Sequence, residues 1–83
     1  MRISVYSLQK VLYQGEADSV NCQTATGEIT ILNHHRPLIS ILREGTMKIV
    51  DQEKKEHYIP VVSGFLEVRS GDEARFLVEE KIN

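Results

Sequence analysis

The chain has little of what stabilises small proteins through cross-links. Cys22 is the only cysteine among 83 residues, so no disulfide can form within the chain. A lone cysteine is typical of a reducing compartment and argues against a secreted, disulfide-bonded scaffold. A domain of this size buries only about 60% of the surface that its unfolded chain exposes. We therefore expect one domain, residues 1–83, that gains stability by docking onto something larger.

An excess of charge of one sign and long apolar runs are also missing. Twelve acidic and ten basic residues give a net charge of -2, and they are interspersed. Because there is no basic stripe, we expect no nucleic-acid partner. No stretch approaches the ~20 apolar residues that span a bilayer, and the first residues lack the apolar core of a signal peptide. We expect a soluble, intracellular protein without a transmembrane segment, which can still lie against a membrane complex.

Several short segments of the chain place apolar residues at every second position, which puts them on one face of a strand. They are Ile3 and Val5, Val20 and Cys22, Met47 and Ile49, and Ala74, Phe76 and Val78. Turn residues recur at roughly eight- to twelve-residue intervals. Gly15 indicates a bulge or turn, Ser63-Gly64 a break between strands, and residues 52–55 and 70–72 hairpin turns. No segment keeps a helical period over the ~12 residues that a helix needs. This pattern predicts an all-β fold of roughly eight to ten short strands, a β-sandwich or flattened barrel.

The stretch Gly27–Leu38 begins with a strand pattern and ends as a polar loop. The polar run consists of Asn33, His34, His35 and Arg36. Pro37 then ends the strand ladder because it has no amide donor. A polar loop between apolar strands is where a small β-domain presents side chains to a partner. We expect this loop, with Glu28 nearby, to be a partner-facing site.

The two adjacent histidines also raise the alternative of a metal-binding enzyme. Neighbours on an extended chain point to opposite sides, and zinc needs three or four ligands. Such a small β-barrel would have to combine His34, His35 and His57, with Cys22 or a carboxylate as a further ligand. The pattern favours polar loop residues over ligands. Cys22 lies mid-strand without a positive neighbour, so we expect a buried, inert thiol.

Two segments are too apolar for half-buried strands. Leu38–Leu42 and Phe65–Val68 carry large apolar side chains on both faces. One face fills the core, so the other is either buried at the sandwich centre or covered by a partner. A generic binding module is a second alternative. It would need exposed aromatic platforms, for which Tyr6, Tyr13 and Tyr58 are the available tyrosines.

Three motifs of the chain resemble the epsilon subunit of F-type ATP synthases. Gly27–Leu32 followed by His35–Ile39 is similar to the GE-x-G-I-L-PGHAPL stretch of that family. Val11–Val20 resembles its VxxxGEVDSV segment, and Ser63–Val68 is similar to its SGGFLEV segment with one glycine missing. The motifs occur in the order and spacing of the family, over nearly the whole chain.

The resemblance implies a ten-stranded β-sandwich and a non-catalytic subunit without a cofactor. Such a subunit belongs to the central stalk, the rotor, and links the gamma subunit to the membrane c-ring, coupling ion translocation to ATP synthesis. The resemblance also implies a peripheral position on the cytoplasmic face of the inner (plasma) membrane. The loop facing the polar loops of the c-ring would comprise Glu28, His34, His35 and Arg36. The face that binds gamma would comprise Leu38, Leu42, Phe65 and Leu66.

The chain departs from the family pattern at the loop. Thr30 replaces a glycine, and Asn33-His34 replaces a Pro-Gly pair, so we expect a different turn. Arg36 replaces an alanine, and we expect its charge to pair with an acidic group of a ring loop. The C-terminal helical hairpin of longer members has no counterpart in these residues. We therefore expect the short form, with no C-terminal helical domain and no inhibition by an extending hairpin.

Overall fold

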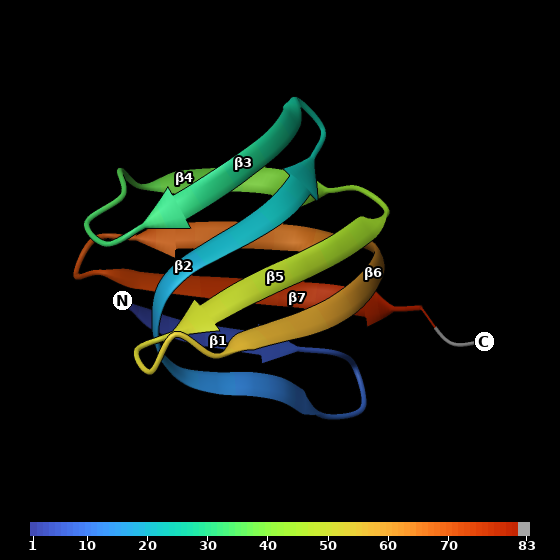
Figure 1. Ribbon diagram of the computed structural model, residues 1–83. Helices are drawn as coiled ribbons and strands as arrows, with labels where there is room; N and C mark the ends of the chain where they lie inside the picture. The colour runs from blue at the N-terminus through green and yellow to red at the C-terminus, as the bar shows by residue number, and fades with distance from the viewer. Residues whose placement is uncertain (82–83) are drawn as a thin grey trace.

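Figure 1 shows the computed structural model, which describes residues 1–81. Its regular elements are β1 (Arg2–Tyr6), β2 (Val11–Thr24), β3 (Gly27–Leu32), β4 (Leu38–Leu42), β5 (Gly45–Asp51), β6 (Glu56–Arg69) and β7 (Glu73–Glu80). The predicted all-β class is confirmed. Within the described residues there is no helix long and apolar enough to cross a bilayer.

Residues 1–81 form seven strands instead of the expected ten, and two of the predicted breaks are bends inside long strands. β2 and β6 each run for 14 residues. The pairing of β2 with β5 shifts register between Ala17 and Ser19, and that of β6 with β7 shifts between Val61 and Ser63. An extra residue at such a bulge bends a strand and increases its twist. Each long strand can therefore pair with different partners along its two halves.

The ladder closes into a flattened barrel. Around it the pairing runs from β1 to β7, β6, β5, β2 and back to β1, and only the contact between β1 and β7 is parallel. β3 continues the sheet beyond β2, and β4 pairs with the second half of β6. Figure 1 shows β2 and β6 curving from one layer to the other. The two layers thus share strands and cannot slide freely past each other.

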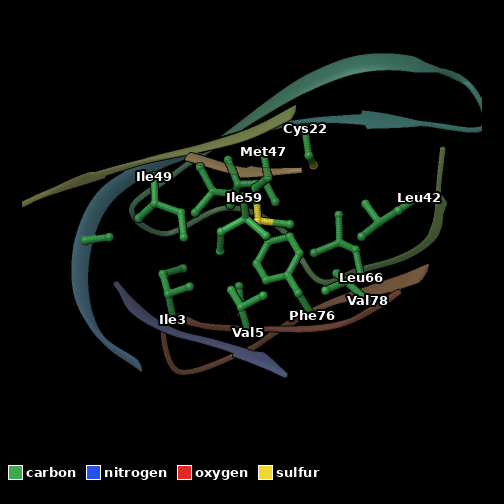
Figure 2. Close-up of a cluster of buried hydrophobic side chains, with 14 of the residues drawn as sticks. Ile3, Val5, Cys22, Leu42, Met47, Ile49, Ile59, Leu66, Phe76 and Val78 are labelled. Atoms are coloured by element: carbon green, nitrogen blue, oxygen red, sulfur yellow. The ribbon is translucent and has the colours of Figure 1, made fainter. Parts of the chain in front are cut away.

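The core lies between the layers, where the side chains predicted to share inner faces meet (Figure 2). Ile3, Val5, Ile49 and Phe76 have no exposed surface. These assignments of strand faces are confirmed. Cys22 is 2% exposed, and burial raises the pKa of its thiol to about 11. The thiolate is therefore scarce at neutral pH, which confirms the inert, buried thiol.

Candidate functional site

Exposed apolar side chains form a row across the outside of four neighbouring strands. In the strand registers, Ile41 on β4 lies opposite Phe65 on β6, and Phe65 lies opposite Leu77 on β7. Leu77 is paired in turn with Tyr6 on β1. Phe65 is 59% exposed, and Ile41 and Leu77 are 56% and 47% exposed. Because residues two apart share a face, Ile39 extends the row along β4 with 76% exposure. We call these five residues the outer apolar face.

Two open hollows flank the centre of the outer apolar face, and Phe65 and Leu77 line both. One, of about 520 Å³, also receives Leu8 from the β1–β2 loop and the acidic Glu79 at the end of β7. The other, of about 360 Å³, is bounded by Tyr6, Ile39, Glu67 and Arg75. Their floors are apolar and their rims are charged. This arrangement suits the side chains of a docking protein, whose interfaces combine an apolar centre with a polar rim.

The structure corrects two residues of the expected apolar face. Leu42 is 2% exposed and Leu66 is fully buried, and both point into the core, as Figure 2 shows. Leu66 lies opposite the buried Phe76, so the register with β7 turns it inward and turns its neighbour Phe65 outward. Leu38 is half-buried against the core. Of the four expected residues, only Phe65 lies on the outer apolar face.

Besides Tyr6, three residues of this face were not assigned to it from the sequence. Ile39 and Ile41 alternate with Leu38, Ser40 and Leu42, and Leu77 alternates with Phe76 and Val78. The signal was the alternation itself: once Leu42 and Phe76 are known to be buried, their immediate neighbours must face outward. Sequence alone does not say which of two apolar faces is the inner one.

The loop between β3 and β4, residues 33–37, is tied to other segments through its first residues. The Asn33 Oδ1 atom accepts a hydrogen bond of 2.7 Å from the Met1 ammonium group. The His34 amide donates one of 2.7 Å to the Asp72 Oδ1 atom in the β6–β7 turn. His34 has a φ of 64°, in the left-handed region, and the His35 amide donates to the Leu32 carbonyl at 3.2 Å. Asn33 and His34 were expected to give a turn different from that of a Pro-Gly pair. In the structure, His34 rather than a glycine occupies the left-handed position of this turn.

The second half of the loop displays its side chains. Arg36 is exposed and His35 is half-buried. The His35 Nδ1 atom lies 2.7 Å from the Arg36 carbonyl oxygen. A carbonyl can only accept, so Nδ1 carries the proton and donates, which fixes the direction of the ring.

The structure brings His34, His35 and Arg36 together but leaves Glu28 at the far end of β3. Glu28 and Leu32 are four residues apart, which separates them by ~13 Å along an extended strand. Glu28, Thr30 and Leu32 are nevertheless all exposed and alternate with the inward Ile31. They form one outward stripe that runs into the loop. We call this stripe with residues 33–37 the β3 surface.

The third histidine of the metal-enzyme alternative has a structural role elsewhere. The His57 Nε2 atom lies 2.9 Å from the Asp51 Oδ2 atom, and its ring meets Tyr13 edge-on with centroids 5.1 Å apart. The hydrogen bond from His57 is the main cause that lowers the pKa of Asp51. Among residues 1–81, no three histidine, cysteine or acidic side chains form a group that could hold a metal. The three histidines do not assemble into one site.

The tyrosines of the binding-module alternative are also dispersed. Tyr6 lies on the outer apolar face, whereas Tyr13 packs on His57. The hydroxyl of Tyr58 donates to the Glu56 carboxylate on the half of β6 that pairs with β5. They form no shared aromatic platform.

Comparison with known proteins identifies the family. Residues 1–83 match the family described as ATP synthase, Delta/Epsilon chain, beta-sandwich domain. The chain belongs to this family. An ATP synthase epsilon chain of Bordetella avium is 41% identical over 71 residues, which are 86% of this chain and 50% of that protein. One of Brevibacillus brevis is 35% identical over 79 residues, 95% of this chain and 59% of that protein. The delta/epsilon-type domain thus spans about half the length of these curated relatives.

Solved structures show the same fold. A chain in the Euglena gracilis mitochondrial ATP synthase, described as OSCP/F1/c-ring, superposes with a TM-score of 0.88 over 96% of this chain and 51% of that chain, at 16% identity. A chain from the central stalk/c-ring of the Tetrahymena thermophila enzyme gives 0.80 over 96% of this chain and 63% of that chain, at 15% identity. At these identities the likeness concerns the fold alone.

The two surfaces of this delta/epsilon-type domain are joined by β4. The β3 surface ends at Pro37, and β4 follows immediately with Ile39 and Ile41 of the outer apolar face. β4 is hydrogen-bonded along its length to β6. The loop and the outer apolar face are therefore connected through paired backbone.

Proposed function

We propose that this chain acts as a non-catalytic subunit of the ATP synthase central stalk, with gamma bound on the outer apolar face and the polar loops of the c-ring on the β3 surface. The exposed row of Ile41, Phe65 and Leu77 carries this proposal. The names of the curated relatives and the subunits named with the solved structures support it. The complex would hold the chain peripherally at the cytoplasmic face of the inner (plasma) membrane.

The outer apolar face accounts for the gamma contact. Burying a large apolar side chain is worth about 1.5–3 kcal/mol, so three such residues supply a substantial part of a stable interface. An exposed apolar row of this kind, rimmed by charge, is typical of a protein interaction surface. Glu67 and Arg75 sit at the rim, where they add specificity more than affinity.

The β3 surface accounts for the ring contact. It is polar, and among the described residues its strand pairs only with β2. It carries an acidic group at one end and Arg36 at the other. Charges of both signs about a strand length apart can match polar loops on a neighbouring surface. Arg36 is placed to pair with a carboxylate there, since its guanidinium offers planar, paired donors.

The role of the barrel is mechanical. Ion flow turns the ring, and torque reaches gamma through a body that must not deform. The closed ladder and the close-packed interior supply that stiffness.

Charge reversal at Glu28 tests the ring contact. In ATP synthase reconstituted into vesicles, we expect Glu28→Arg to lower proton pumping per ATP hydrolysed while ATPase activity stays unchanged. Glu53→Arg is the control, because Glu53 is an exposed acid in the β5–β6 turn and is not part of the β3 surface. An unchanged pumping ratio in Glu28→Arg, or an equal loss in both variants, would contradict the proposed contact.

A further inference from the structure

We infer that Asp72 is a positioning residue for the β3–β4 loop: its carboxylate fixes the backbone at His34 and so sets the direction in which His35 and Arg36 are presented. The contact of these two side chains with the c-ring rests on the proposed function. The anchoring of the loop by Asp72 is independent of that function.

Asp72 bridges segments that are distant in the sequence. It is 38 residues from His34, and its Oδ1 atom accepts the His34 amide at 2.7 Å. Its backbone carbonyl accepts the Arg2 amide at 2.9 Å, which ties the same residue to β1. Its Oδ2 atom lies 3.5 Å from the Met1 ammonium group. One residue of the β6–β7 turn thus joins the start of β1 to the loop.

The loop needs such a partner because its turn is strained. His34 holds a φ of 64° without being glycine. A residue with a Cβ is destabilised in the left-handed region, because its Cβ comes close to the following carbonyl oxygen. A hydrogen bond from its amide to a carboxylate is stronger than one to a neutral acceptor and helps to offset that cost. The ring of His35 is bonded to the Arg36 carbonyl within the loop, so its direction follows the loop backbone. That backbone is anchored by the His34 amide on Asp72 and by the His35 amide on the Leu32 carbonyl.

A simpler role for Asp72 is to supply its own left-handed turn, with a φ of 61°. Glycine and asparagine adopt that conformation more readily than other residues. Asp72→Gly therefore keeps the turn and removes the carboxylate. Asp72→Asn keeps the turn and an oxygen acceptor but removes the charge. The two variants separate the turn from the bond to His34.

Amide hydrogen exchange and NMR on the purified chain test the positioning directly. In the wild type we expect a protected His34 amide whose proton shift follows the titration of Asp72. That titration lies below the usual aspartate range, since the hydrogen bond from His34 is the main cause that lowers the pKa of Asp72. In Asp72→Gly we expect protection at His34 to fall at least tenfold while the β5 amides stay unchanged. In Asp72→Asn we expect partial protection and no titration. Unchanged protection in Asp72→Gly would overturn the inference.

A second measurement tests the consequence for coupling. In reconstituted ATP synthase we expect Asp72→Gly to lower the pumping ratio and Asp72→Asn to restore most of it. If the loop loosens in Asp72→Gly but pumping is unchanged, the positioning stands and the ring contact of the proposed function fails. If His34 stays protected in Asp72→Gly, the positioning fails whatever the pumping ratio.

Discussion

Phe65 and Leu66 are neighbours with opposite roles. Phe65 is 59% exposed and Leu66 is fully buried. We expect Leu66→Ala to lower the free energy of unfolding by about 2–5 kcal/mol, because it leaves a cavity in the core. Phe65→Ala should cost less than about 1 kcal/mol, as most surface changes do. Urea denaturation of both variants checks this, and equal losses would show that the face assignment is wrong.

The pair of Asp51 and His57 predicts a pH dependence of stability. The pKa of Asp51 is lowered in the folded chain, chiefly by the hydrogen bond from His57. A lowered carboxyl pKa stabilises the fold above the unfolded value of about 3.9, and this contribution is lost as the pH falls through the folded pKa. We expect the free energy of unfolding to decline less steeply below about pH 4 in Asp51→Asn than in the wild type. If the free energy of unfolding falls equally steeply with decreasing pH in both proteins, this role of Asp51 is contradicted.

At the residue scale, alternation predicted the inner faces and the inert thiol correctly. The same alternation places apolar side chains on both faces of Leu38–Leu42 and Phe65–Val68. Leu42 and Leu66 were assigned to the outer face, but both point into the core. That choice depends on the register between β6 and β7, which is a long-range pairing. The bond from His34 to Asp72 could not be predicted for the same reason, since it joins two turns far apart in the chain.

At the scale of elements, Gly64 permits the close approach of β6 and β7. A Cβ at this position would overlap the backbone carbonyl oxygen of Leu77 and lie 3.0 Å from the Val78 Cα atom. We expect Gly64→Ala to lower the free energy of unfolding by about 1–3 kcal/mol, since backbone must move. Gly45→Ala is the control: its nearest neighbour, at 2.7 Å, is a Gln23 side-chain atom, which can shift. Thermal unfolding of both variants checks this, and an equal or larger loss in Gly45→Ala would refute it.

Gly15 was interpreted as a bulge or turn between two strands and Ser63-Gly64 as a break, which gave too many strands. Both positions lie inside long strands, β2 and β6. Local turn chemistry indicates where a chain bends but not whether pairing continues through the bend. The hairpin turns at residues 52–55 and 70–72 were predicted correctly, because there the chain reverses between adjacent strands.

At the scale of the whole molecule, the closed barrel presents an apolar face on β1, β4, β6 and β7 and a polar one on β3 and the loop after it. Family membership followed from the sequence motifs, and the all-β class followed from the period-two alternation and the turn spacing. The composition of the apolar face required the structure. The central claim is that this face, and no other aromatic-bearing surface of the chain, binds gamma.

Photocross-linking within the assembled ATP synthase tests that claim most directly. A benzophenone amino acid replaces either Phe65 or Tyr58, two aromatic residues of β6 that are equally exposed at 59% but lie on its two halves. We predict an adduct with gamma from position 65 and none from position 58. An adduct from position 58 alone, or equal adducts from both positions, would contradict the account.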